Sequence, residues 1–167
     1  LHLIYKLIYI TINNDRNNHD NNDIYGDLFA HIGDYTNAVK YYTKYLELYR
    51  EYINYGNTLE YIKSRTNIKN ILAQYKYYTI YEKIADCYLK LKYYKNAEIY
   101  YNYTIDYYNT IESIINSDTK HELYSSNNNS ARCYYKCSQC YKFFHDRANE
   151  LLYINKAIAG GYYIPPP

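Results

Sequence analysis

Two stretches of this 167-residue chain repeat one pattern of apolar and small residues without a gap. They are YGDLFAHIGDYTNAVKYYTKYLELY (25–49) and IADCYLKLKYYKNAEIYYNYTIDYY (84–108). Each reads as an apolar helix, a short break and a second amphipathic helix, which predicts a helical hairpin. The matching positions are Gly26 and Ala85, Phe29 and Tyr88, Tyr35 and Tyr94, Ala38 and Ala97, Tyr42 and Tyr101, and Leu46 and Ile105. Such a hairpin buries its apolar face only against a neighbour, so the repeat predicts stacked hairpins.

The spacing of apolar residues between the polar connectors indicates helices throughout. Proline occurs only in the final PPP, and five glycines are too few for the many tight turns of an all-β protein. The apolar residues recur at intervals of three and four, in stripes made by Ile80, Ile84, Cys87, Tyr88 and Leu91, and by Ala97, Tyr100, Tyr101, Thr104, Tyr107 and Tyr108. We therefore expect an all-α fold, a helical-hairpin solenoid of about three hairpins.

Composition divides the chain into four parts. Residues 1–12 are apolar and read as the end of a preceding element or a stray apolar segment, too short to span a bilayer. Residues 13–23 form an Asn- and Asp-rich linker, 24–160 the helical repeat domain, and 161–167 an extended Pro-rich tail. Residues 116–130 are a second polar connector. Because the chain contains no Met, we expect a fragment or a chain without its true start.

The second repeat carries the most specific motif of the chain. It reads Tyr81-x2-Ile84-Ala85-x2-Tyr88, then a helix break, then Ala97-x3-Tyr101. This pattern resembles the tetratricopeptide repeat, and the first repeat follows it with Tyr25, Gly26, Phe29, Ala38 and Tyr42. The first repeat departs from the pattern at Asn22, where an aromatic residue is expected, and neither repeat closes with the proline of the family.

A third repeat is weaker and the spacing is long. The residues that fit it are Tyr134, Cys137, Ser138, Tyr141, Ala157 and Ile158. Glu150 stands where an alanine is expected and Ala148 lies two residues early, which predicts a shortened turn between the helices. The repeats lie 59 and 53 residues apart, against a usual period of about 34. We expect longer helices or an extra helix between them, with a helix stop at Gly56 and a new N-cap at Asn57.

The stretch CYYKCSQCYKFFH (133–145) offers an alternative chemistry. Cys133, Cys137 and Cys140 have the C-x3-C-x2-C spacing that radical-SAM enzymes use for an iron–sulfur cluster, and His145 could complete a zinc site. The same three cysteines are spaced i, i+4 and i+7, which places them on one side of a helix. A zinc site needs four ligands that converge. We therefore expect buried structural thiols and no metal or cofactor, with a Cys-ligated metal protein as the less favoured alternative.

Charge and motifs exclude several classes of function. The formal net charge is +2, and Lys and Arg are interspersed with Asp and Glu, which disfavours nucleic-acid binding. P-loop, GxSxG and HExxH motifs are absent from the sequence, so we expect no enzyme. Four cysteines, three of them clustered, suit reduced thiols in the cytoplasm better than a secreted disulfide framework.

The resemblance implies a scaffold that binds a protein or peptide in a concave groove lined by the first helix of each hairpin. The groove candidates are Asp23, Asp27 and Ala30; Glu82, Lys83, Asp86 and Lys90; and Arg132, Lys136, Gln139 and Phe143. Of these, we select Asp27, Lys83, Asp86, Lys90, Arg132, Lys136 and Gln139. Asp23 and Asp27 stand where relatives that clamp a terminal carboxylate need Lys and Asn, which disfavours that mode.

Two further resemblances leave alternatives open. The long spacing is similar to that of soluble NSF-attachment proteins, adaptors of membrane fusion. GDLFAHIGDYTNAVKYY (26–42) is similar to a segment of tonsoku-like genome-maintenance proteins. The sequence leaves the partner and the oligomeric state open.

Overall fold

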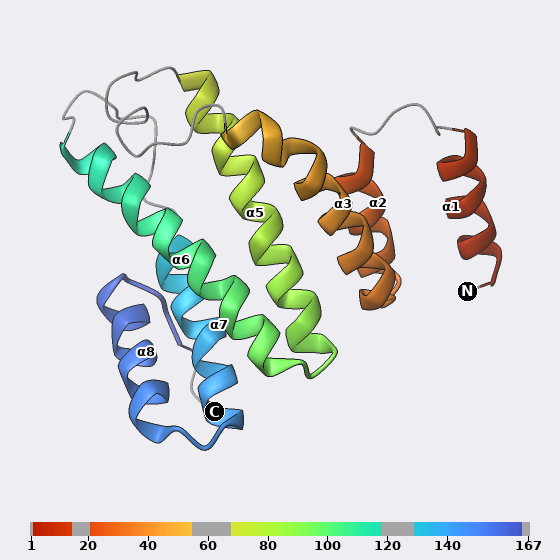
Figure 1. Cartoon of the computed structure of the whole chain (residues 1–167). Helices are drawn as coiled ribbons and strands as arrows, with labels where there is room; N and C mark the ends of the chain where they lie inside the picture. The colour runs from red at the N-terminus through yellow and green to blue at the C-terminus, as the bar shows by residue number, and fades with distance from the viewer. Residues whose placement is uncertain (1, 15–20, 55–67, 118–128, 165–167) are drawn as a thin grey trace. The chain divides into compact units, whose positions relative to one another are not determined.

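The computed structural model describes residues 2–14, 21–54, 68–117 and 129–164. These residues form an all-α fold, as the sequence predicts, in which helices that follow one another in the chain pack in pairs. The helices are α1 (His2–Asn14), α2 (Asn22–His31), α3 (Tyr35–Asn54), α5 (Ile68–Lys90), α6 (Tyr94–Ser117), α7 (Asn129–Phe143) and α8 (Arg147–Ala159) (Figure 1). No helix among the described residues is both long and apolar enough to cross a membrane.

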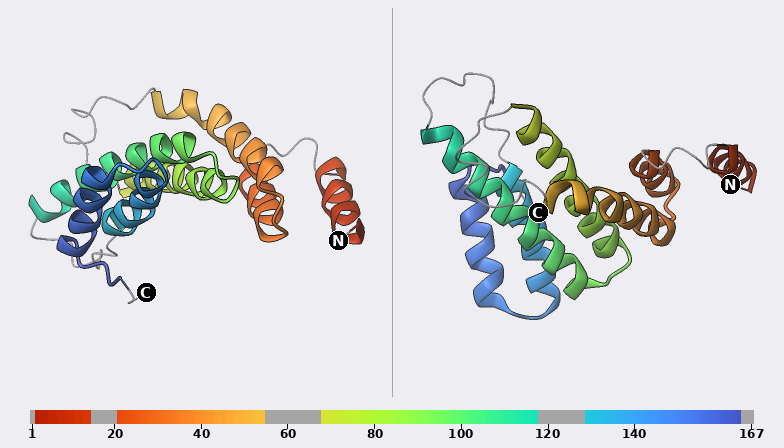
Figure 2. Two further views of the ribbon diagram at one scale, coloured as in Figure 1. Left: turned by 90° about the horizontal axis from the view of Figure 1, so that it is seen from below. Right: turned by 45° about the horizontal axis from the view of Figure 1, so that its top comes forward.

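The helices group into two compact units. Unit 1 spans Leu1–Leu91 and unit 2 spans Lys92–Pro167. In unit 1, α2 packs along α3 and α3 packs along α5; in unit 2, α7 packs against both α6 and α8 (Figure 2). The first and third predicted hairpins are therefore the pairs α2–α3 and α7–α8. The second predicted hairpin consists of α5 and α6, which belong to different units.

Three turns that connect consecutive helices share one length and one backbone conformation. Each turn has three residues, 32–34, 91–93 and 144–146, and its middle residue has a positive φ: 82° at Gly33, 63° at Lys92 and 56° at His145. These residues are 59 and 53 apart, as the repeats are. The expectation of a shortened third turn is therefore wrong. Glu150 occupies the alanine position and is buried, and its carboxylate is compensated by pairing with Arg147 at 2.8 Å.

Hydrogen bonds at the first and third turns are the same. The N–H groups of Asp34 and Asp146 donate to the carbonyls of Phe29 and Tyr141, five residues earlier, which ends α2 and α7 in Schellman motifs. The side chain of Asp146 then accepts from the backbone N–H of Asn149 at 3.1 Å, and that of Asp34 accepts from Asn37 at the same distance. These aspartates cap the helices that follow, so the same local sequence pattern stabilises both turns.

Where the structure describes the surplus residues between the repeats, they lengthen the helices. The helices α3, α5 and α6 contain 20, 23 and 24 residues. The predicted stop at Gly56 and N-cap at Asn57 lie outside the described residues. The predicted linker is narrower than expected, because α1 continues to Asn14 and α2 begins at Asn22.

The core consists of tyrosines and small residues at the predicted repeat positions. Buried Ala38 and Ala97 allow the helices to approach, and the rings of Tyr42 and Tyr101 fill the space beside them. The segments at the two ends also pack. Rings of α1 lie against Phe29, and Tyr162 stacks on Tyr135 of α7 at 5.0 Å between ring centroids, so the start of the predicted tail rests on unit 2.

Candidate functional site

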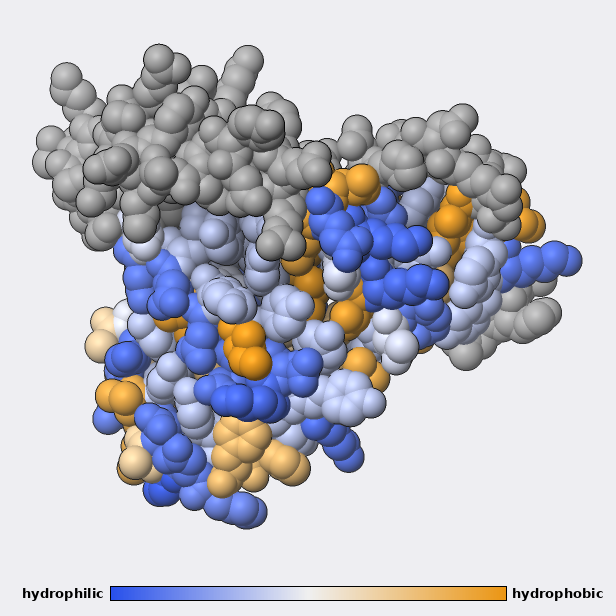
Figure 3. Space-filling view, viewed as in Figure 1, coloured by the Kyte–Doolittle hydropathy of each residue, from blue (hydrophilic) through white to orange (hydrophobic). Residues whose placement is uncertain are grey.

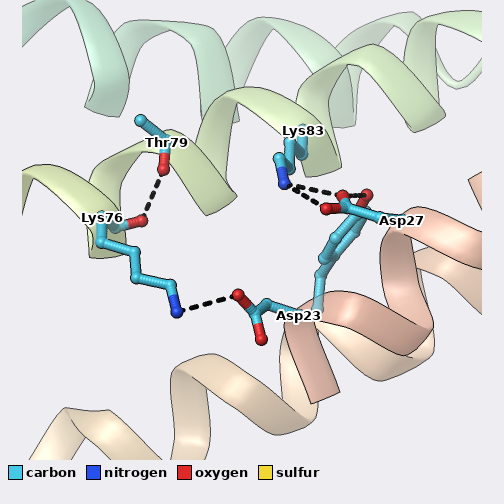
Figure 4. Close-up of polar contacts among 6 residues, drawn as sticks. Asp23, Asp27, Lys76, Thr79 and Lys83 are labelled. Atoms are coloured by element: carbon cyan, nitrogen blue, oxygen red, sulfur yellow. Dashed lines mark hydrogen bonds and ion pairs between the residues drawn. The ribbon is translucent and has the colours of Figure 1, made fainter. Parts of the chain in front are cut away.

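The charged side chains of the first helices meet across unit 1. Lys83 of α5 donates to both carboxylate oxygens of Asp27 on α2, at 2.6 and 2.8 Å (Figure 4). The side chains of Lys83 and Asp27 are 39% and 50% exposed, so the pair lies on a solvent-facing surface. The sequence placed both residues on the groove side of successive first helices, and the structure brings them into contact.

The position of Asp27 is fixed by the residue before it and by a tyrosine of α3. Gly26 leaves room for the ring of Tyr42, which packs where a side chain would otherwise stand. The Tyr42 hydroxyl donates to Oδ1 of Asp27 at 2.6 Å, and Lys83 lies 5.7 Å from the centroid of the same ring. Burial, and then the hydrogen bond to Asp27, raise the pKa of Tyr42 far above its usual range. Tyr42 therefore stays neutral and holds the carboxylate in place as a hydrogen-bond donor.

A second ion pair lies one turn earlier on α2. Lys76 of α5 contacts Oδ2 of Asp23 at 3.0 Å and lies 5.3 Å from the centroid of the Tyr45 ring. Partial burial lowers the pKa of Lys76, but the hydrogen bond and charge of Asp23 outweigh it, so the net shift is upward. Oδ1 of Asp23 is buried without a hydrogen-bond partner. Asp23 is a buried ion-pair partner rather than an exposed groove residue, which corrects its placement from the sequence.

The remaining candidates of unit 1 lie along α5. Asp86 and Lys90 follow Lys83 by three and seven residues, so they continue the same side of the helix. Asp86 is half-buried and Lys90 is exposed. Glu82 was also expected on this side, but its side chain is buried. It directly precedes Lys83 and therefore lies on a neighbouring side of the helix. We use the term unit 1 face for Asp27, Lys83, Asp86 and Lys90.

In unit 2 the candidates lie along α7. Arg132, Lys136 and Gln139 are spaced i, i+4 and i+7 and are half-buried; we call them the unit 2 face. No acidic residue occurs in α7. Each buried cysteine of α7 directly follows one of these three residues in the sequence. Helix α5 belongs to unit 1 and α7 to unit 2.

Hydrogen bonds from tyrosines hold α7 and α8 to α6. Tyr141 donates to Oε1 of Glu98 at 3.0 Å, and Tyr153 of α8 donates to Oδ1 of Asn102 at 2.8 Å. Burial is the main cause that raises the pKa of both tyrosines, and Glu98 adds to the shift. Further along α6, Asn109 donates to the Tyr134 hydroxyl at 2.9 Å. These hydrogen bonds connect α6, α7 and α8 through side chains.

The cysteines of α7 face the core. Cys133, Cys137 and Cys140 are each 0% exposed and carry free thiols, as their spacing predicts. Burial raises the pKa of the Cys140 thiol to about 12 and that of Cys137 further, and burial also raises the pKa of Cys87 in α5 to about 12. Protonated thiols are poor metal ligands and poor nucleophiles. Within the described residues, no three His, Cys, Asp or Glu side chains are placed to hold a metal ion.

Sequence reasoning missed the contributions of Lys76 and Tyr42 to the site. Lys76 falls in the surplus segment between the repeats, but it lies seven residues before Lys83 and so on the same side of α5. Asp23 and Asp27 are likewise four residues apart on α2. Two matched pairs at helical spacing were thus a visible signal. The groups assembled here form ion pairs and hydrogen bonds within unit 1.

Comparison with known proteins gives no match: no protein-family model and no curated protein is similar to the chain at a significant level.

Proposed function

We propose that the chain is a non-enzymatic scaffold of tetratricopeptide type, whose first helices bind a peptide or helical segment of a partner protein. The observation that carries the proposal is the contact of Lys83 with Asp27, because it joins the first helices of two successive repeats through charged groups that lie toward solvent. First helices of successive repeats form the binding surface of helical-repeat proteins.

The charges of the two faces indicate what such a partner carries. The unit 1 face is close to neutral, since Asp27 and Asp86 balance Lys83 and Lys90. The unit 2 face is cationic, because Arg132 and Lys136 lie on a helix without acidic residues. Complementary charges steer and orient a partner more than they raise its affinity. We therefore propose that the partner presents polar groups to the unit 1 face and acidic groups to the unit 2 face.

Affinity capture from a lysate of the source organism, with variants of each face, tests this function. Lys90→Glu and Lys136→Glu are the test variants. Lys40→Glu, at an exposed lysine of α3, is the control because it makes the same change of charge outside both faces. Lys90 is preferable to Lys83, since reversing Lys83 would also place a second carboxylate beside Asp27. We expect a captured protein that both test variants lose and the control keeps. Capture of the same proteins by all four forms would contradict the proposal.

The length of the helices supports a second candidate, an adaptor that resembles soluble NSF-attachment proteins. Helix α5, the turn after it and α6 together span residues 68–117, which exceeds the period of about 34 of an ordinary tetratricopeptide repeat. Such an adaptor would bind an elongated helical bundle rather than a peptide. Binding of a preassembled four-helix SNARE bundle, with no binding of its separate helices, would favour this candidate over the peptide scaffold.

The four buried thiols fit a reducing compartment, and we propose that the protein acts in the cytoplasm. Fusion to a fluorescent protein in cells of the source organism tests this location.

A further inference from the structure

One end of unit 2 brings together aromatic residues from three segments. Helix α6 begins at Tyr94, and α7 ends at Phe143 directly before the turn to α8. The rings of Tyr94 and Phe143 stack with 3.7 Å between centroids, and Phe144 lies 6.3 Å from Phe143. The start of α6 and the α7–α8 turn therefore occupy the same end of the unit.

These aromatic residues are unusually exposed for their size. Tyr93 is 60% exposed, Phe143 56% and Phe144 38%. Phe143 and Phe144 are two of only three phenylalanines in the chain, whereas the third, Phe29, is completely buried. Adjacent exposed phenylalanines at a turn are costly in water, and large apolar groups of this kind mark contact surfaces. We call Tyr93, Phe143 and Phe144 the aromatic tip.

The charges around the aromatic tip are arranged with cations outward and carboxylates inward. The side chains of Lys95 and Arg147 are both 70% exposed, while their partners Glu98 and Glu150 are only 12% and 10% exposed. Lys92 and Lys142 are also exposed beside the tip. In Figure 3, hydrophobic and strongly hydrophilic side chains alternate at the end where Figure 1 places the α7–α8 turn. The exposed charged side chains described at this end, Lys92, Lys95, Lys142 and Arg147, are thus cations, while half-buried Asp146 of the same turn caps α8.

We propose that the aromatic tip attaches the protein peripherally to an anionic membrane surface. Aromatic side chains favour the boundary between headgroups and acyl chains, and flexible lysines keep their ammonium groups in the headgroup layer while their stems remain apolar. Cations beside the tip complement the negative potential of anionic lipids. An acidic protein segment would need anchors arranged along a helix or groove, whereas these rings sit at a helix end and a turn. The inference is independent of the partner scaffold and uses none of its face residues.

Vesicle flotation with the full chain tests the attachment. The probes are phosphatidylcholine vesicles with and without phosphatidylserine, at low and high salt. We expect binding only with phosphatidylserine, weakened by salt. The double variant Phe143→Ser/Phe144→Ser should lose about tenfold in affinity, since two large apolar groups no longer leave water. Lys92→Gln/Lys142→Gln should also weaken binding.

Two matched controls separate the tip from general changes of the surface. Leu151→Ser/Ile158→Ser removes exposed apolar residues of α8, and Lys40→Gln/Lys44→Gln removes two exposed charges of α3 in unit 1. Both should bind as the wild type does. Thermal unfolding by circular dichroism checks that every variant folds.

An indole placed in the tip gives a readout that does not depend on loss of binding. The chain contains no Trp, so Phe144→Trp introduces its single indole, and Leu151→Trp is the control. The emission of the first variant should shift to the blue with phosphatidylserine vesicles, and that of the second should not. Absence of wild-type binding, equal binding by the phenylalanine double variant, or an unshifted emission would overturn the proposal. Binding to poly-glutamate without binding to vesicles would also overturn it, in favour of an acidic protein.

Discussion

A Cβ atom added to Gly26 of α2 would lie 2.3 Å from Cε1 of Tyr42 on α3. The ring cannot easily withdraw, because its hydroxyl is hydrogen-bonded to Asp27 and the side chain is buried. The small residue at this repeat position is thus required by the aromatic residue of the partner helix, and the two positions should vary together.

Gly26→Ala should lower the free energy of unfolding by up to about 2 kcal/mol. Overpacking against Tyr42 costs about 1–3 kcal/mol, and the better helix propensity of alanine offsets about 1 kcal/mol of that loss. Urea unfolding measures the change. The double variant Gly26→Ala/Tyr42→Leu should lose less than the two single variants together, because leucine leaves room for the new methyl group. A stabilised Gly26→Ala protein would contradict this packing.

The shared conformation of the turns predicts opposite effects of glycine at equivalent positions. Lys92→Gly and His145→Gly should each stabilise the fold by about 0.5–1 kcal/mol, because their positive φ strains a side chain with a Cβ. Gly33→Ala should cost about 1 kcal/mol, since its φ is 82°. Phe144→Gly, one residue before His145, is the control and should destabilise. Differential scanning calorimetry distinguishes the set, and destabilisation by both new glycines would show that the turns are not equivalent.

Asp34 should give the N-terminal part of the chain a measurable sensitivity to acid. Burial alone raises the pKa of the Asp34 carboxyl. Hydrogen bonds from Asn37 and from Tyr5 lower this pKa by more than burial raises it, so the net shift is downward. A group with a lowered folded pKa adds stability that is present above its unfolded pKa of about 3.9 and is lost as the pH falls through the folded value. The carboxyl is largely solvated, so its contribution stays under about 1 kcal/mol.

Asp34→Asn should therefore flatten part of the decline in stability below about pH 4 and change little at neutral pH, because asparagine also caps helices. Stability measured against pH for Tyr5→Phe separates the contribution of the Tyr5 hydroxyl from that of Asn37. That variant keeps the cap but loses the 2.8 Å bond from α1, and amide exchange in α1 should become faster. Identical acid profiles for wild type and Asp34→Asn would contradict the assigned hydrogen bonds.

The thiols should be unreactive in the folded protein. All four cysteines are buried, and burial raises the pKa of Cys87, Cys137 and Cys140, which leaves little thiolate of these three at pH 8. Iodoacetamide should modify them slowly in buffer and rapidly in guanidinium. Cys137→Ala should cost about 1–3 kcal/mol and Cys137→Ser a similar amount or more, because a buried hydroxyl needs a partner. Rapid native modification, or one bound zinc per chain, would restore the metal-site interpretation of the cysteines.

The sequence predicted the helical hairpins well because their determinants are local. The helical spacing of Ile80, Ile84 and Cys87 and the small residues at Ala38 and Ala97 need no tertiary information, and all of these residues are buried. The third turn was predicted wrongly because Glu150 stands at a core position where an alanine was expected. This mismatch suggested a shorter turn. Asn149 would have corrected the register, since Asn37 and Asn96 occupy the same place in the other repeats.

The site was less predictable because exposure and pairing depend on neighbouring helices. Asp23 and Asp27 are one turn apart and look equivalent in sequence, yet Asp23 is buried against Lys76 while Asp27 remains exposed. The segment around Lys76 has no repeat partner, so sequence comparison gave it no role. The packing of α5 against the other helices of unit 1 determines which charged side chains form ion pairs.

The most direct test of the scaffold function is photo-crosslinking from defined positions of the folded protein. A photoreactive residue would replace Lys90 on the unit 1 face or Gln139 on the unit 2 face, with Lys40 and exposed Leu152 as controls. In a lysate of the source organism, Lys90 and Gln139 should give adducts with a common protein, and the controls should not. Adducts with the same proteins from all four positions, or none from the two faces, would contradict a scaffold that binds its partner through its first helices.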